Sequence, residues 1–292
     1  MSSLEDFSDI LKRGEPLAPL TWLKVGGTAS HLAEPQSVEQ LQSLVQCCNE
    51  QSVPVRVLGG GSNVLISDNG FDGVVVRLTA DAFSSVSVSG TTVTAAGGAT
   101  LSHVISESVK AGLAGLEQLA GIPGTVGGAI HGNAGTRLTD VGNFVTSVSV
   151  LTATGELREL AEDALTFSYR TSSVDELVVL SCTLELKQDE PEAITERMRK
   201  VWIMKKATQP LSSQSAGCIF KNPRGLSAGD LIEQAGLKGT RIGGAEISDR
   251  HANFIVTADG ATCADVLQLI EKAKSEVSEH FGVDLETEIE IW

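Results

Sequence analysis

The segment from Gly112 to Gly135 constrains the fold of this chain more than any other, because eight of its twenty-four residues are glycine. So many glycines destabilise the interior of a helix or a strand. We therefore expect irregular backbone here, of the kind that wraps around a large flat or extended ligand. A loop with a purely structural role is the alternative interpretation.

A second glycine cluster directly follows a predicted buried strand at 53–58. It reads Gly59-Gly60-Gly61-Ser62-Asn63, and a further strand is expected at 64–66. Successive backbone amides in such a turn can form a concave nest for an anion, and glycine lets a phosphate approach closely. A tight turn without a ligand would explain the glycines equally well. The cluster is neither a Walker A loop nor a GxGxxG motif. Two such clusters together favour a dinucleotide, with one cluster for each end.

Length, charge and cysteine content limit the class of protein. A chain of 292 residues is typical of about two domains. The net charge of −15, from 22 basic and 37 acidic residues, argues against nucleic acid as a partner. Five scattered cysteines indicate neither a disulfide framework nor a zinc site, and we expect no metal. The chain has no apolar run of membrane-spanning length and no signal-peptide layout, so we expect a cytoplasmic protein.

Hydrophobic periodicity, caps and turn residues predict a mixed α+β chain. Helices are expected at 37–51, 100–110, 191–206, 230–235 and 264–280. Further strands are expected at 74–78, 86–88, 93–95, 144–152, 156–160, 177–186, 217–220, 253–257 and 285–291. The charge-rich helix that begins at Pro191 marks the expected boundary between a region 1–190, with lobes of about 1–70 and 71–190, and a domain 191–292.

A series of motifs between about residue 20 and residue 290 resembles the UDP-N-acetylenolpyruvoylglucosamine reductase (MurB) family. The motifs are TWLKVGG at 21–27, VLGGGSNVL at 57–65, the segment 115–135, FSYR at 167–170, SAGCIFKNP at 215–223, AGLKG at 235–239 and LETE at 285–288. The short connection after Arg170 is similar to the shorter subclass of the family, which lacks an inserted tyrosine-bearing loop.

The resemblance implies a fold and a reaction. The fold would be an FAD-binding PCMH-type (VAO-like) two-lobed region at 1–190, followed by an α+β substrate-binding domain at 191–292. FAD would be the cofactor and NADPH the co-substrate in reducing the enolpyruvyl ether of UDP-N-acetylglucosamine to UDP-N-acetylmuramate. That step belongs to peptidoglycan precursor synthesis, hence to cell wall biogenesis, cell shape and cell division. We expect a cytoplasmic monomer whose partners are the UDP-sugar and NADPH, without nucleic acid or membrane.

The resemblance also assigns the two glycine clusters to FAD, with the pyrophosphate at 59–63. The implied cofactor-binding residues are Gly59, Gly60, Gly61, Ser62, Asn63, Gly121, Ile122, Pro123, Gly124, Val126, Gly127, Gly128, Ala129, Gly132, Asn133 and Gly135.

Three catalytic residues are implied: Arg170, Cys218 and Glu288. The Arg170 guanidinium can hold a carboxylate bidentately, although a salt-bridged arginine at a strand end is the plainer interpretation. Cys218 occupies the position of the family's usual proton-donating serine, and a buried, inert thiol is its alternative. Glu288 matches the family's catalytic glutamate. Periodicity places it on one strand face with Glu286 and Glu290, which would otherwise be a solvated acidic face.

The implied substrate-binding residues are Tyr169, Lys206, Lys221, Asn222 and His251. His251 could instead be a solvated or capping residue. Glu290 stands where many relatives carry an arginine, which puts one substrate contact in doubt.

Two other functions stay open from the sequence. One is an FAD oxidase or dehydrogenase of the same fold that acts on an alcohol or a sugar. It would leave the motifs around Cys218 and Glu288 without a purpose. The other is a flavin-binding protein that has lost catalysis and serves as a sensor or partner. Cys218 and Glu290 favour that interpretation, whereas Arg170 and Glu288 speak against it.

Overall fold

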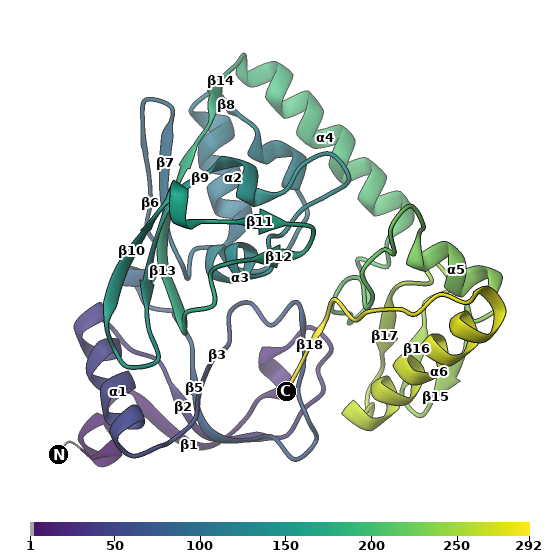
Figure 1. Ribbon diagram of the computed structural model, residues 1–292, viewed down its shortest axis with the longest axis horizontal. Coiled ribbons are helices and arrows are strands. Elements are labelled where there is room, and N and C mark those ends of the chain that lie inside the picture. The colour runs from purple at the N-terminus through teal and green to yellow at the C-terminus, as the bar shows by residue number, and fades with distance from the viewer. Residues whose placement is uncertain (1–2) are drawn as a thin grey trace. The chain divides into compact units, whose positions relative to one another are not determined.

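The computed structural model describes residues 3–292 and confirms the α+β class (Figure 1). By contact, the chain forms two compact units. Of the described residues, the first unit comprises 3–14, 30–60 and 72–203, and the second comprises 15–29, 61–71 and 204–292. The contact units are thus discontinuous, and the division into a flavin domain and a substrate domain at residue 190 stays a prediction. Within residues 3–292, no helix is long and apolar enough to cross a membrane.

A four-stranded sheet and one helix form a core of the first unit. The sheet has the order β1-β2-β5-β3, from Leu11–Pro16, Thr28–Ala33, Phe71–Val76 and Val55–Val57. Strands β3 and β5 are parallel, with Val55 opposite Val74. Helix α1, Val38–Glu50, begins at the N-cap Ser37 and buries one apolar face. Leu41 and Leu44 of this face share a hydrophobic cluster with Val74. This packing positions the end of β3, from which the first glycine cluster follows.

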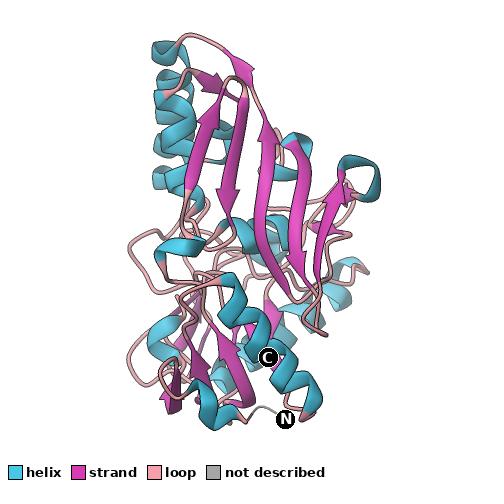
Figure 2. Cartoon of the chain, turned by 90° about the vertical axis from the view of Figure 1, so that its left-hand side faces the viewer, coloured by secondary structure: helices cyan, strands magenta, loops and turns pink. Residues whose placement is uncertain are grey.

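A five-stranded antiparallel sheet forms the other core of the first unit, with its strands side by side in Figure 2. Its order is β10-β9-β13-β7-β6, from Leu157–Ala161, Val145–Leu151, Val178–Glu185, Thr92–Ala96 and Val86–Ser89. The strands expected at 86–88 and 93–95 form the antiparallel pair β6–β7, and those expected at 144–152 and 156–160 form the antiparallel pair β9–β10. Helix α2, Leu101–Lys110, is capped by Thr100 as expected and buries Val104 and Ile105 in the same cluster as Val148 of β9.

The glycine-rich segment 112–135 differs from its prediction. It contains a short strand β8 at Leu113–Ala114, a 3-10 helix η4 at Leu116–Leu119 and a helix α3 at Val126–His131. The expectation of wholly irregular backbone is therefore wrong. Helix α3 forms because Thr125 caps it and because Val126 and Ile130 are buried in the core of the five-stranded sheet. Tertiary packing thus outweighs the low helix propensity of two glycines.

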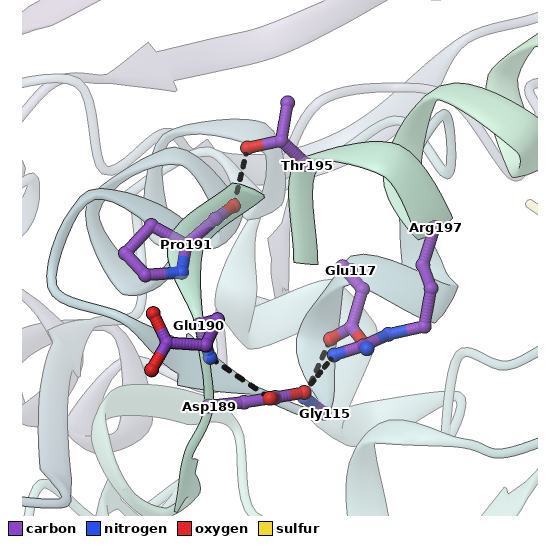
Figure 3. Close-up of polar contacts among 7 residues, drawn as sticks. All are labelled: Gly115, Glu117, Asp189, Glu190, Pro191, Thr195 and Arg197. Atoms are coloured by element: carbon purple, nitrogen blue, oxygen red, sulfur yellow. Dashed lines mark hydrogen bonds and ion pairs between the residues drawn. The ribbon is translucent and has the colours of Figure 1, made fainter. Parts of the chain in front are cut away.

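Helix α4, Pro191–Thr208, begins at the expected proline, and Arg197 fixes it to the first unit (Figure 3). The Arg197 Nε donates to Glu117 Oε1 at 2.8 Å, and a terminal nitrogen donates to Asp189 Oδ2 at 2.7 Å. Glu117, which is only 3% exposed, also accepts from the amide of Gly115. The Arg197 hydrogen bond holds the pKa of Asp189 below its usual range. The buried Glu117 carboxylate is thus compensated at the start of η4.

The second unit packs two helices against a small antiparallel sheet. Helices α5, Ala228–Gln234, and α6, Cys263–Phe281, share a core with β15 at Arg241–Ile242, β16 at Ala245–Ile247 and β17 at Ile255–Thr257. Thr262 and Asp265 form a capping box on α6, and Asp68 accepts from the amides of Cys263 and Ala264. Strand β18, Glu290–Ile291, pairs in parallel with β4, Val64–Leu65.

The remaining short elements complete the described chain. They are 3-10 helices η1 at Leu4–Phe7, η2 at Ala18–Leu20, η3 at Asp81–Phe83, η5 at Val141–Phe144 and η6 at Glu162–Ala164, and strands β11 at Phe167–Ser168, β12 at Thr171–Ser172 and β14 at Lys187–Gln188.

Two expected strands are largely absent. Residues 217–220 form only single bridges, from Cys218 to Phe254 and from Phe220 to Thr287. The reason is that the buried Asn253 side chain binds the backbone polar groups of Phe220 that a neighbouring strand would otherwise bind. Its Oδ1 accepts from the Phe220 amide at 2.9 Å, and its Nδ2 donates to the Phe220 carbonyl at 2.8 Å. The strand expected at 285–291 is reduced to β18. Of the three glutamates only Glu290 belongs to this strand, so the alternation that predicted one acidic face does not apply to Glu286 and Glu288.

We predict that Asn253→Ala destabilises the protein, because it leaves the buried amide and carbonyl of Phe220 without partners. The expected loss in free energy of unfolding is about 3 kcal/mol, since each unsatisfied buried polar group costs roughly 1–3 kcal/mol. Urea denaturation with FAD present measures the loss. The exposed Asn49→Ala at the end of α1 serves as the control and should leave the midpoint unchanged. Equal stability of the two variants would contradict the role given to Asn253.

Candidate functional site

The loop 59–63 presents a row of amides without protein partners. Within residues 3–292, the N–H groups from Gly59 to Asn63 donate no hydrogen bond, although Gly61 accepts one from Trp22. The backbone bends through a φ of +65° at Gly61, where a Cβ would overlap the carbonyl oxygen of Leu20. Unpaired successive amides at a tight bend form an anion nest. The loop therefore fits a negatively charged group such as the pyrophosphate of FAD.

Gly59 and Gly60 of the first cluster lie against the second cluster within the first unit. A Cβ on Gly59 would lie 2.7 Å from Thr125 Oγ1, and one on Gly60 would lie 2.8 Å from the Cα of Gly124. Glycine is therefore required for the close approach of the two backbones. The assignment of both clusters to FAD stays a prediction.

The start of α3 does not add to the nest. The amides of Val126 and Gly127 donate to the carbonyls of Ala99 and Gly97 at 2.8 and 2.7 Å, and the Gly128 amide donates to Thr125 Oγ1 at 3.4 Å. These three amides are used inside the protein. Any contact of the segment 121–135 with FAD therefore rests on its other groups, such as the exposed Pro123.

Arg170 lies in a strained turn. Tyr169 and Arg170 are the two residues between β11 and β12, where Ser168 pairs with Thr171. Arg170 has a φ of +55°, a value at which glycine or asparagine is usual. Its guanidinium carbon lies 5.3 Å from the centroid of the Tyr169 ring. A charged side chain held in an unfavourable backbone conformation is a feature that clusters at functional sites.

Asn133 holds this turn to the glycine-rich segment. The buried Asn133 donates from Nδ2 to the carbonyl of Ser168 at 2.7 Å, and its Oδ1 accepts from the Gly142 amide at 3.0 Å. Its own φ is +42°. The predicted cofactor segment and the predicted Arg170 turn are thus connected by one side chain.

The backbone segments that carry Cys218 and Glu288 are hydrogen-bonded to each other in the second unit. Residue Ile219, directly after Cys218, accepts from the Glu288 amide at 2.7 Å and donates to the carbonyl of Asn253 at 2.8 Å. Cys218 is half-buried and follows Gly217, which has a φ of +78°. The thiol and the carboxylate thus belong to neighbouring extended segments.

Asn63 contacts the same part of the second unit. Its Nδ2 donates to the Glu288 carbonyl at 3.1 Å, and its carbonyl accepts from the Glu290 amide at 3.1 Å. The last residue of the nest is therefore bonded to both sides of Ile289.

The predicted substrate residues of the second unit have protein partners of their own. Lys221 pairs with Glu286 at 2.6 Å, and Asn222 Oδ1 accepts from the amide of Ala228 at the start of α5. His251 accepts from the Asn253 amide and packs edge-on against Phe254, and burial lowers its pKa, which favours the neutral ring.

Lys206 is exposed at the end of α4, and Arg250 holds this end. The terminal Arg250 nitrogen donates to the Lys206 carbonyl at 2.6 Å and to the Ala207 carbonyl at 3.1 Å. A cation that binds the free carbonyls of a helix C-terminus stabilises it. Arg250 thereby holds the backbone of Lys206.

The other four cysteines are buried, and burial raises the pKa of Cys182 to about 12 and those of Cys48 and Cys263 to about 11. Such thiols stay protonated and unreactive near neutral pH. Cys218 is the most accessible cysteine of the described chain.

Sequence reasoning missed Asn253, which orders the backbone next to Cys218, and the pair of Arg197 and Glu117, which fixes helix α4 to η4. Glu117 lies inside the motif at 115–135, which could have drawn attention to it. Nothing in the sequence, however, indicates that it pairs with an arginine eighty residues later. Asn253 stands at the start of a predicted strand, where an asparagine commonly belongs to a turn.

Two family models match this chain, one in its N-terminal part and one in its C-terminal part. Residues 209–292 match the family model for the C-terminal domain of UDP-N-acetylenolpyruvoylglucosamine reductase, and residues 29–161 match the model for an FAD binding domain. The predicted cofactor FAD is thereby confirmed.

Relatives cover nearly the whole chain. UDP-N-acetylenolpyruvoylglucosamine reductase of Bacillus velezensis is 42% identical over 95% of this chain and 92% of the relative. The enzyme of that name from Bacillus subtilis is 41% identical with the same coverage.

Solved structures agree with the fold class. The Thermus caldophilus reductase superimposes with a TM-score of 0.84 at 38% identity and covers 97% of this chain and 98% of its own. A glucose oxidase, Phl p 4, shares only the fold, with a TM-score of 0.51 at 21% identity over 63% of this chain and 42% of its own. The predicted PCMH-type (VAO-like) flavoprotein fold is confirmed, and the chain belongs to the UDP-N-acetylenolpyruvoylglucosamine reductase family.

Proposed function

We propose that this chain uses NADPH to reduce the enolpyruvyl ether of UDP-N-acetylglucosamine to UDP-N-acetylmuramate, in peptidoglycan precursor synthesis. The observation that carries the proposal is the pairing of the Cys218 and Glu288 segments through Ile219 in a chain of this family. The protein would work in the cytoplasm as a monomer, with small molecules as its only partners.

FAD would be held by the amides of the loop 59–63 and by the segment 121–135. When bound, it would supply the transfer of a hydride from NADPH to the vinyl carbon distal to the ether oxygen. Addition of hydride there leaves negative charge on the neighbouring carbon, delocalised into the carboxylate. The protein must therefore stabilise that charge and deliver one proton.

Arg170 is proposed to bind the substrate carboxylate. Its guanidinium stays charged at any working pH and can form two parallel hydrogen bonds to a carboxylate. The tight β11–β12 turn limits the backbone freedom of Arg170, and Asn133 fixes that turn. A preorganised cation of this kind stabilises charge that develops during the reaction.

Cys218 is proposed to deliver the proton. Glu288 is proposed to stabilise the developing negative charge by donating a hydrogen bond in its protonated form, because an ionised carboxylate would repel that charge. A thiol is a stronger acid than a serine hydroxyl, with an ordinary pKa of about 8.5. The backbone bond from Glu288 to Ile219 places the two residues on adjacent segments. Tyr169, Lys206, Lys221, Asn222 and His251 stay proposed substrate contacts.

An anaerobic absorbance experiment tests the proposed reaction. We expect NADPH to bleach the flavin band of the purified protein, and we expect the enolpyruvyl nucleotide sugar to restore it. An alcohol or a free sugar should neither bleach nor restore the band. Bleaching without recovery on addition of the enolpyruvyl compound would contradict the proposed substrate and favour a flavoprotein with another acceptor.

The proposed role of Cys218 predicts that two substitutions at this position differ in activity. Cys218→Ser keeps a proton donor and should retain activity, whereas Cys218→Ala should lose about 100-fold or more, the scale of general acid catalysis. Iodoacetamide near pH 8 should inactivate the wild type by labelling Cys218, because the raised pKa values keep the buried thiols of Cys48, Cys182 and Cys263 protonated. Peptide mass spectrometry locates the label. Full activity of Cys218→Ala would exclude the thiol as donor.

The strained turn predicts that two truncations of Arg170 differ in stability but not in activity. Both Arg170→Gly and Arg170→Ala remove the guanidinium and should lose at least about 100-fold in turnover, as for removal of one charge-stabilising donor. Arg170→Gly should nevertheless be the more stable by about 1 kcal/mol, because only alanine suffers the left-handed conformation. Urea denaturation measures that difference. Equal stability would argue against the positive φ.

A further inference from the structure

The side chain of Asn63 is bonded to the backbone of the proposed catalytic carboxylate. Asn63 is the last residue of the amide nest, and its Nδ2 donates to the Glu288 carbonyl at 3.1 Å. Its own carbonyl accepts from Glu290, and from that point the parallel pairing of β4 with β18 continues. The contact joins residues 225 positions apart in the chain.

Glu288 itself lies outside any regular strand. Strand β18 begins only at Glu290, so no sheet ladder holds the peptide groups of Glu288. Its amide is fixed by the Ile219 carbonyl at 2.7 Å, and its carbonyl is fixed by Asn63. Two hydrogen bonds, one on each side, thus set the backbone from which the carboxylate projects.

We propose that Asn63 is a positioning residue, which orients Glu288 by binding its carbonyl. This inference rests on the proposed function, because it gives Glu288 its role in the reaction. It adds to the expected cofactor-binding role of Asn63: the nest needs only the Asn63 amide, whereas the side chain holds the segment of Glu288. The loop 59–63 would then serve the cofactor and the acid–base chemistry together.

The chemistry of asparagine suits this role. Only the amide form of the side chain can donate to a carbonyl, and an aspartate at the same place would repel it. A hydrogen bond at an exposed residue contributes little to folding, so its loss should affect geometry more than stability. A displacement of about 1 Å at a reacting group can cost about 100-fold in rate.

The test separates the two half-reactions in stopped-flow experiments on the FAD-loaded protein. We expect Asn63→Asp and Asn63→Ala to slow reoxidation of the reduced flavin by the enolpyruvyl substrate by about 10- to 100-fold. Reduction by NADPH and the Kd for FAD should stay within about threefold, since the nest amides remain. Asn69→Asp is the matched control, with the same charge change on an exposed asparagine of the same unit, and should leave both steps unchanged.

A double-mutant cycle distinguishes positioning from a general structural effect. If Asn63 acts through Glu288, the loss caused by Asn63→Ala should largely disappear in a Glu288→Gln background. Additive losses would overturn the proposal. Normal rates of flavin reoxidation in both Asn63 variants would also overturn it. A parallel loss of FAD affinity and of both half-reactions would overturn it as well, because it would make the Asn63 side chain a cofactor ligand. Failure of the wild type to be reoxidised by the substrate would refute the proposed function itself.

Discussion

The carbonyl oxygen of Ile219 is the atom on which the arrangement of the second unit depends. It accepts from the amides of Glu288 and Ile289, while the amide of the same residue binds Asn253. A buried backbone must satisfy its polar groups, and here no continuous sheet ladder does so. Hydrogen bonds from individual residues replace the sheet ladder. Cys218 and Glu288 therefore lie outside regular strands, although hydrogen bonds still fix the backbone of their segments.

The sequence predicted the periodic elements well because their signals are local. Helix α2 begins after Thr100 and α4 begins at Pro191, both as expected, since caps and prolines act within one helical turn. The segment around Cys218 was predicted as a strand from its apolar residues. That prediction failed because Asn253, thirty-three residues beyond Phe220, supplies the partners that a neighbouring strand would have supplied.

The candidate site could be predicted only at positions where the residue type itself indicates a structural or chemical role. A run of three glycines indicates a close backbone approach, and the approach of Gly60 to Gly124 is observed. The turn at Arg170 gave no such signal, because neither of its residues is one that a tight turn favours. A residue that breaks a local rule without a structural benefit is best explained by function. The bond from Asn63 to Glu288 joins residues 225 positions apart, and neither local sequence pattern predicts it.

The distribution of charge explains how an acidic protein can bind anionic ligands. The net charge of −15 opposes the long-range attraction of a nucleotide sugar, and the Lys221 ammonium is already paired with Glu286. The groups proposed to bind an anion are therefore local: neutral amides at 59–63, the guanidinium of Arg170 and the ammonium of Lys206. Backbone dipoles bind a phosphate without requiring an excess of cations. Specificity for the ligand would then rest on the positions of these groups, and the side chains that fix them, Asn133 and Asn63, matter as much as the groups themselves.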